Sequence, residues 1–196
     1  MPPLCLLALL HWPAVGWGAC EDPPARRVNW LRCDKRGADL AGADLREAVL
    51  TQVNLAGARL AGARLAGADL GDATLTGADL TGATLTAARL VSAKLERAVF
   101  ADASMAGARL DRAVLTGANF GGADLNGGRF YQADLAGANL SGAKLDKANL
   151  AQANLTDAKL PDAVLSGATL SRAALENAVL TGATLRGAKL DGANLL

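Results

Sequence analysis

A large apolar residue recurs at every fifth position of this chain, and no other feature restricts the fold so strongly. Thirty-two such positions follow one another without a gap from Leu40 to Leu195. On an α-helix, a step of five residues rotates by about 500°, so these side chains would spiral around the helix without forming an apolar face. On a continuous strand they would alternate between the two faces. The chain must therefore turn once in every repeat. All of these positions are Leu except Phe100, Met105, Phe120 and Phe130.

The residues around each large side chain indicate where the turn falls. Ala stands two positions before it in every repeat except at Val53 and Gly128, and residues two apart share one face of an extended segment. The residue between them is usually polar and is expected to point outward. The two residues that follow the large one are typical of turns, and the second is often Gly. Each repeat is thus predicted to be a three-residue strand followed by a corner.

Corners that all turn the same way close the chain into a coil, and coils then stack on one another. If each corner turns by about 90°, four repeats close one coil, and residue n lies over residue n+20. This register stacks Phe100 on Phe120 in adjacent coils and places Phe130 on the opposite face. We interpret the three rings as core packing.

The motif A(D/N)LxG, repeated in tandem from Gly37 to Leu196, resembles the pentapeptide-repeat family. The resemblance implies an all-β fold, a right-handed quadrilateral β-helix, here with about eight coils. It implies no single activity. Some cytoplasmic members of the family mimic DNA and bind DNA gyrase, but those members are notably acidic.

The segment before the repeats, "CEDPPARRVNWLRC", is similar to the N-terminal cap of exported bacterial members of that family. The similarity rests on Cys20, the pair Pro23-Pro24, the run Val28-Asn29-Trp30, and Cys33. Counting back in fives puts Trp30 in the slot of a large core residue, so Trp30 is predicted to plug the open end of the solenoid. We therefore place an N-terminal cap at residues 20–36 and the β-solenoid at residues 37–196.

Residues 1–19 have the features of a secretory signal peptide. An apolar run at Leu4–Leu10, too short to span a bilayer, precedes small residues and a cleavage site near Gly18 or Ala19. The start, "MPP", lacks Lys and Arg, so a mis-assigned start codon or a cytoplasmic apolar N-terminus stays open as an alternative. We expect a periplasmic or secreted protein with no transmembrane segment in the mature chain.

The cysteines are consistent with export. Cleavage would remove Cys5 and leave Cys20 and Cys33, an even pair that predicts one disulfide in a secreted protein. In the alternative interpretation, "WGAC" is a degenerate lipobox, Cys20 is lipidated and anchors the protein to a membrane, and Cys33 stays free.

Charge and residue types argue against several classes of function. Twenty Lys and Arg against nineteen Asp and Glu give a formal net charge of +1, which favours neither a nucleic-acid binder nor a DNA mimic. The single His, His11, falls in the predicted signal peptide, so the mature chain lacks a Ser/His/Asp or Cys/His arrangement. Two cysteines thirteen positions apart do not match zinc-ligand spacing. We predict no enzyme, no metal site and no cofactor.

One flank breaks the alternation of charge seen elsewhere, where Asp39 and Arg59 or Asp44 and Arg64 face each other one coil apart. Arg89, Arg109 and Arg129 stand twenty apart and are expected to form one column. Like charges at strand spacing are mildly unfavourable unless an anion lies between them. The candidate anion or partner stripe also includes two nearby outward residues, Arg112 and Tyr131. Gly107 and Gly127 flank the column and are expected to leave it accessible. The alternative is a solvated face partly neutralised by Asp111.

The C-terminal end of the solenoid has no polar or helical cap in the sequence. A stack of coils exposes unpaired strand edges at its ends, so homodimerisation through the coil of Leu180–Leu195 is predicted. We predict a non-enzymatic β-solenoid that serves as a surface for an unknown protein partner, or as a scaffold, in the cell envelope. The alternative is a cytoplasmic DNA-mimic-like inhibitor or modulator that docks on a nucleic-acid enzyme such as DNA gyrase.

Overall fold

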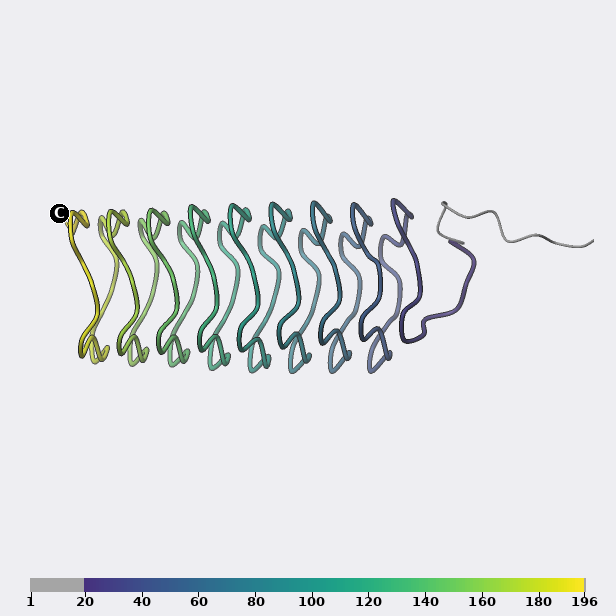
Figure 1. Ribbon diagram of the computed structural model, residues 1–196, viewed down its shortest axis with the longest axis horizontal. Coiled ribbons are helices and arrows are strands. Elements are labelled where there is room, and N and C mark those ends of the chain that lie inside the picture. The colour runs from purple at the N-terminus through teal and green to yellow at the C-terminus, as the bar shows by residue number, and fades with distance from the viewer. Residues whose placement is uncertain (1–19, 196) are drawn as a thin grey trace, which may run out of the picture.

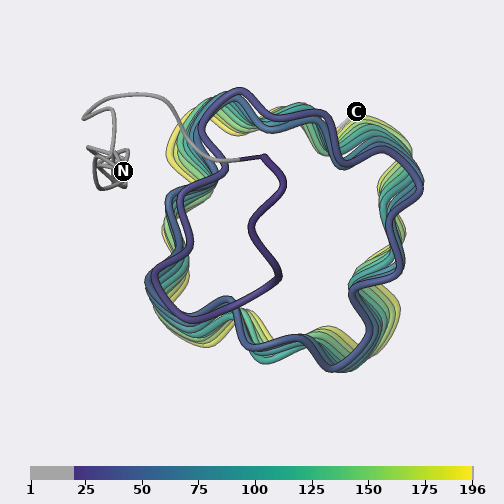
Figure 2. The ribbon, with the colours of Figure 1, turned by 90° about the vertical axis from the view of Figure 1, so that its right-hand side faces the viewer.

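The computed structural model describes residues 20–195, which form a rod of stacked coils (Figure 1). Viewed along the rod, the coils superpose as a four-sided outline (Figure 2). Residues 20–195 contain no helix and no strand longer than one residue. The extended pieces are short, and parallel β-bridges join single residues of neighbouring coils instead. Every bridge connects residues twenty apart, from Asn29↔Val49 to Ala174↔Asn194. The predicted signal peptide, residues 1–19, lies outside the described residues.

Backbone hydrogen bonds hold each coil to the next in the same way all along the rod. In the repeat around Leu40, the backbone N–H of Leu40 donates to the carbonyl of Arg59 at 2.7 Å, and that of Gly42 donates to Ala61 at 2.9 Å. The N–H of Arg59 returns a bond to the carbonyl of Ala38 at 2.9 Å. Three bonds per repeat therefore link neighbouring coils, which satisfies most backbone groups without long strands.

Each corner is a tight turn with its second residue at positive φ. At the corner after Leu40, the N–H of Ala43 donates to the carbonyl of Leu40 at 3.0 Å, and Gly42 has φ of 67°. This is the pattern of a type II turn, which favours Gly at that position because Gly has no Cβ. Asp72 occupies the same place with φ of 55°, so the fold tolerates other residues there at some cost in strain.

The polar residue in the middle of the motif has a structural task. The N–H of the first corner residue makes no backbone–backbone bond to the neighbouring coil. In many repeats whose middle residue is Asp or Asn, the side chain of that residue, two positions earlier, accepts it instead. Asn54 Oδ1, for example, accepts from the N–H of Ala56 at 3.1 Å. Short Asp and Asn side chains reach the backbone two residues on, which longer or apolar ones do not. The same bond forms at Asn29, Asp34, Asp39, Asp44, Asp69, Asp79, Asn119, Asp124, Asp134, Asn139, Asn149 and Asn154.

The core consists of the large residue and the small residue of each repeat. Leu and Ala at these positions are buried from Leu45 to Leu175. The rings of Phe100 and Phe120 stack with centroids 4.9 Å apart, and Phe130 meets Phe120 edge-on at 6.4 Å. A Cβ at Gly128 would lie 2.9 Å from Cε2 of Phe130. Gly in place of Ala at position 128 therefore makes room for the Phe130 ring, which is larger than the Leu side chain of most repeats.

The N-terminal cap continues the register of the solenoid. Its first described residues run across the open end of the four-sided outline (Figure 2). Trp30 is fully buried, its backbone N–H donates to Val49 at 2.8 Å, and its indole N–H donates to the carbonyl of Asp22 at 3.2 Å. The ammonium of Lys35 lies 4.3 Å from the Trp30 ring centroid, and a disulfide joins Cys20 to Cys33.

Candidate functional site

The three column arginines lie on one flank of the rod, in the outward slot of three successive coils. Parallel bridges pair Arg89 with Arg109, and Arg109 with Arg129. Bridged strands are about 4.8 Å apart, so three guanidinium groups start from backbone positions at that spacing. Each of these side chains is about half exposed. The geometry therefore places like charges close together on an accessible surface.

The charge of Arg89 is compensated by the coil before it. Its Nη1 lies 2.8 Å from Oδ1 of Asp69, one coil away. The guanidinium reaches this carboxylate by lying over Gly71, where an added Cβ would be only 2.4 Å from Nη1. Gly71 has no positive φ to explain the glycine, so the space for Arg89 is the physical reason for it.

Arg109 and Arg129 share one carboxylate, that of Asp111. Oδ2 of Asp111 lies 3.3 Å from Nε of Arg129 and 3.9 Å from Nε of Arg109. Asp111 is only 6% exposed, and its Oδ1 is buried with no hydrogen-bond partner among the described residues. Buried polar atoms without a partner are rare in proteins. One acid therefore serves two guanidinium groups, and this part of the column keeps a positive excess.

Arg112 and Tyr131 lie at the corner beside the column. The backbone N–H of Arg112 donates to the carbonyl of Tyr131 at 2.9 Å, so the two residues occupy neighbouring coils at that corner. The Tyr131 hydroxyl donates to Oε1 of Gln152 at 3.3 Å. At the opposite corner, no atom lies within 4 Å of where a Cβ would be on Gly107 or Gly127. The structure thus brings the five residues of the stripe together and leaves one edge of it open.

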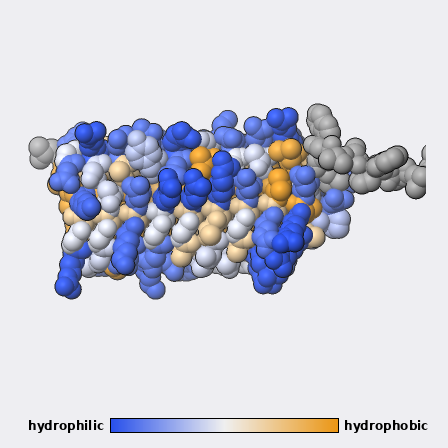
Figure 3. All heavy atoms as spheres, viewed as in Figure 1, coloured by the Kyte–Doolittle hydropathy of each residue, from blue (hydrophilic) through white to orange (hydrophobic). Residues whose placement is uncertain are grey.

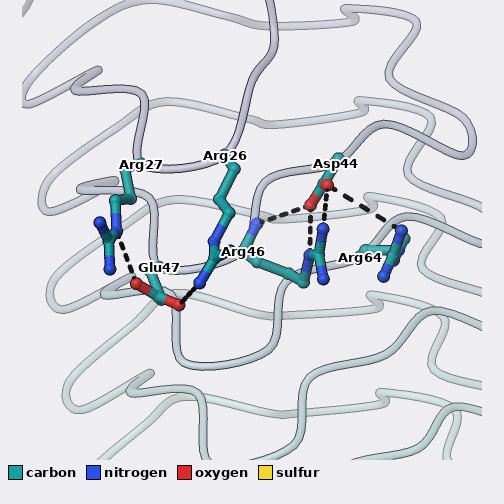
Figure 4. Close-up of polar contacts among 6 residues, drawn as sticks. All are labelled: Arg26, Arg27, Asp44, Arg46, Glu47 and Arg64. Atoms are coloured by element: carbon teal, nitrogen blue, oxygen red, sulfur yellow. Dashed lines mark hydrogen bonds and ion pairs between the residues drawn. The ribbon is translucent and has the colours of Figure 1, made fainter.

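A second charged cluster, which the sequence analysis did not single out, lies at the N-terminal end. Arg26 and Arg27 of the cap both point toward Glu47, and Asp44 faces Arg46 and Arg64 (Figure 4). Nε of Arg27 is 2.7 Å from Oε2 of Glu47. Arg27 and Glu47 are twenty apart, so applying the coil register to corner residues would have found this contact.

The predicted ion pair between Asp44 and Arg64 forms across one coil, but it is not the shortest contact that Asp44 makes. Nη1 of Arg64 lies 3.9 Å from the Asp44 carboxylate, whereas Nε of Arg46 lies 2.7 Å from it. The Arg46 hydrogen bonds hold the pKa of Asp44 at about 2, below the usual 3.8. Arg26, followed by Arg27, lowers the pKa of Glu47. A partner two residues away within the same turn is closer than one in the next coil, so the local pair dominates.

Residues 20–195 contain neither a cluster of metal-ligating side chains nor a membrane-spanning helix. No group of three or more His, Cys, Asp or Glu side chains in this range is placed to hold a metal ion. No helix in this part of the chain is long and apolar enough to span a bilayer. His11 falls outside the described residues. The face seen in Figure 3 is mixed in character, with hydrophilic side chains beside residues of intermediate hydropathy and a few strongly apolar ones.

A coil that returns every twenty residues, filled by stacked Leu and Ala, defines a β-helix of tandem five-residue units. The family described as pentapeptide repeats matches residues 33–72, 63–100, 93–132, 133–171 and 158–195, and the chain belongs to this family. Its fold is accordingly a right-handed β-helix.

The chain is similar to solved structures of pentapeptide repeat proteins, and the likeness in fold rests on one of them. A trypsin-treated form of QnrB1, a plasmid-mediated fluoroquinolone resistance protein, is 21% identical, with a TM-score of 0.59 over 85% of this chain and 83% of that one. HetL, involved in heterocyst differentiation regulation in the cyanobacterium Nostoc sp. strain PCC 7120, is 33% identical over 86% and 87% of the two chains, with a TM-score of 0.31. No curated protein matches the sequence at the significance applied. At 21% identity, the likeness to QnrB1 shows the fold alone.

Proposed function

We propose that this protein is a non-enzymatic β-solenoid, four-sided and with about eight coils, that serves as a protein-binding or scaffold surface in the cell envelope. The observation that carries the proposal is the arginine column. Arg109 and Arg129 share the single buried carboxylate of Asp111, and both remain about half exposed on a flank with an open glycine edge. A rigid stack of coils holds such groups at fixed spacing, which suits recognition of another macromolecule.

Export to the envelope is the second part of the proposal. It is supported by the apolar N-terminal segment and by the disulfide between Cys20 and Cys33, because structural disulfides persist in oxidising compartments. That bond uses the Cys20 sulfur that a lipid anchor would need, so lipidation and this disulfide exclude each other. A periplasmic or secreted protein is therefore favoured over a lipidated one.

Mass spectrometry of the intact protein and of its N-terminal peptide, isolated from fractionated cells, tests export. We expect a chain in the periplasmic or secreted fraction that begins near Cys20 and is two mass units lighter before reduction than after it. A lipid adduct on Cys20 would replace this proposal with the membrane-anchored form. An intact Met1 in the cytoplasm would overturn export altogether.

A cytoplasmic inhibitor or modulator that docks on a nucleic-acid enzyme such as DNA gyrase is the second candidate. The likeness in fold to QnrB1, a fluoroquinolone resistance protein, favours it. The formal net charge of +1 does not, because a mimic of DNA needs a strongly acidic surface. A DNA supercoiling assay with purified gyrase distinguishes the two candidates, and we expect no change in the rate of supercoiling.

We also propose that two copies pair end to end through the C-terminal coil. Leu195 is 56% exposed, and Leu180, Leu185 and Leu190, which occupy core slots, are only partly buried. The backbone N–H groups of these last three residues have no carbonyl partner within residues 20–195. A second copy would cover the apolar side chains and pair the strand edge. A monomer in sedimentation equilibrium at high micromolar concentration would contradict this.

A further inference from the structure

We infer that the arginine column receives an acidic α-helix of the partner, with its carboxylates along one side and its axis parallel to the rod. The inference rests on the proposed binding function and names the partner that would fit it. The residues that carry it are Arg109, Arg129, Arg112 and Tyr131, together with the buried Asp111.

The spacing of the column favours a helix over an extended chain. Bridged residues of neighbouring coils are about 4.8 Å apart. On an α-helix, side chains three or four residues apart have Cβ atoms about 5–6 Å apart, so successive carboxylates stay close to the register of the arginines. On an extended chain, side chains on one side recur at about 6.6 Å and fall out of register after one step. Acidic residues at i, i+4 and i+7 of a helix lie about 6 and 10.5 Å along its axis, and therefore match successive coils to within about 1 Å.

The charges of the site leave donors for such carboxylates. Asp111 contacts Arg109 and Arg129 through their Nε atoms, and the terminal nitrogens of each guanidinium carry four further N–H groups. Arg112, at the adjacent corner, adds a third exposed guanidinium to this part of the surface. Arg89 contributes less, because Asp69 already holds its Nη1 at 2.8 Å. These three guanidinium groups therefore bind two or three carboxylates of the partner.

Asp111 is a positioning residue in this arrangement. Its carboxylate is buried beneath the two side chains that it contacts, and its Oδ1 has no partner among the described residues. A buried oxygen without a partner is unfavourable, and native proteins retain few of them. Here the same carboxylate attracts the Nε edges of two arginines, which leaves their terminal N–H groups for a ligand.

The edges of the flank leave room for a helix. A helix with its side chains is about 10–12 Å across. Gly107 and Gly127 have no atom within 4 Å of the Cβ direction, so the corner on their side is open. On the other side, the partly buried ring of Tyr131 offers the kind of aromatic contact that anchors protein interfaces.

Fluorescence anisotropy with labelled helical peptides tests the inference. The probe is an Ala-rich peptide of about twenty residues, long enough to be helical, with Glu at steps of alternately four and three residues (i, i+4, i+7, i+11, i+14), which keeps them along one side. A second peptide of the same composition distributes the Glu residues around the helix. We expect the full chain to bind the one-sided peptide at least about tenfold more tightly than the scattered one, and less tightly as salt is raised.

Two double variants test the column, and each removes two positive charges from the middle position of the repeat. Arg109→Ser with Arg129→Ser is expected to weaken binding of the one-sided peptide by at least about tenfold. Lys144→Ser with Lys159→Ser removes two exposed cations from the same slot on the other flanks, and is expected to leave binding unchanged. Thermal melting of both variants confirms that each is folded.

Four results would overturn the inference. They are no binding of the one-sided peptide, equal binding of both peptides, equal losses in the two double variants, and heparin binding that exceeds peptide binding and depends on the column. The proposed function fails separately. If wild type and Arg109→Ser/Arg129→Ser capture the same envelope protein equally well, the solenoid binds a partner but not through this column. If neither captures any protein, the binding function itself is contradicted.

Discussion

The two ends of the rod differ in how the apolar core is covered. At the N-terminal end the chain crosses the opening, Trp30 is fully buried, and a disulfide closes the cap (Figure 2). At the C-terminal end no coil within residues 20–195 covers the last one, and Leu195 is 56% exposed. Both ends break the same periodic core, but only one of them is covered within the described residues.

This difference separates what a repeat does from what an end does. In the middle of the rod, each coil is buried by the coils on both sides, and the same three backbone bonds recur. The ends must satisfy an apolar face and a strand edge by other means. Substitutions at the two ends are therefore expected to differ in cost even where the residues occupy the same slot.

The largest effect is expected from opening the N-terminal end. Trp30→Ala removes a fully buried side chain and should lower the free energy of unfolding by about 3–5 kcal/mol. In the monomer, below the concentration at which end-to-end pairs form, Leu190→Ala in a large-residue slot of the last coil is expected to cost less than about 1.5 kcal/mol, because Leu190 is only partly buried without a second copy. Equilibrium denaturation in urea measures both. Equal costs would show that the two ends are equally covered in solution.

Removal of the disulfide comes next. Cys20→Ser with Cys33→Ser should lower the free energy of unfolding by about 2–3 kcal/mol, because the unfolded chain gains the freedom of an open loop. Adding a reductant to the wild-type protein should lower the melting temperature to that of the double variant. The double variant itself should not respond to the reductant, and a response would mean that the stabilisation comes from elsewhere.

A smaller effect is expected at the C-terminal end, and it concerns assembly. Leu185→Lys places a charge on the partly buried face of the last coil and should disfavour end-to-end pairing. Sedimentation equilibrium across a range of concentrations should show a dimer for wild type and a monomer for the variant. Lys144→Ser, on a flank in the middle of the rod, serves as the control and should stay dimeric. A dimer that survives Leu185→Lys would place the contact elsewhere.

Most of the fold could be predicted from the spacing of large residues. A period of five excludes a helix and a continuous strand, and the register n over n+20 follows once the coil has four sides. The bridges confirm that register, including the stacking of Phe100 on Phe120 and the extension of the ladder back to Asn29. Periodicity alone could not give the handedness, which came from the resemblance to the family.

The details of polar contacts were harder to predict, because they depend on side-chain reach. The sequence showed that Asp and Asn favour the middle slot, but the hydrogen bond to the corner N–H appeared only in three dimensions. Asp111 was expected to neutralise the column partly, yet its burial and the unpartnered Oδ1 have no signal in the periodicity. The contact of Arg46 with Asp44 has no signal in the coil register either, because the two residues lie two positions apart within one turn.

A modest effect is expected from loosening the clamp on the cap. Glu47→Gln removes the carboxylate that Arg26 and Arg27 both contact. These ion pairs are exposed, so the global stability should change little, but trypsin should cleave after Arg26 and Arg27 faster than in wild type at low salt. High salt should reduce the difference. Glu96→Gln, in the middle of the rod, should not change cleavage at the cap, and a change would point to a general loss of stability.

The smallest effect is a change in titration with almost no change in stability. The pKa of Asp44 is about 2, against a usual value of 3.8, because Arg46 and, more weakly, Arg64 favour the carboxylate. A folded-state pKa below the unfolded one means that this contribution to stability is complete above about pH 4 and is lost as the pH falls toward 2. Arg46→Ser should therefore raise the Asp44 midpoint toward 3.8 in an NMR titration, whereas Arg64→Ser should move it much less. A larger shift from Arg64→Ser would restore the pairing one coil apart as the dominant one, and the contacts at this corner would then follow the coil register that governs the core.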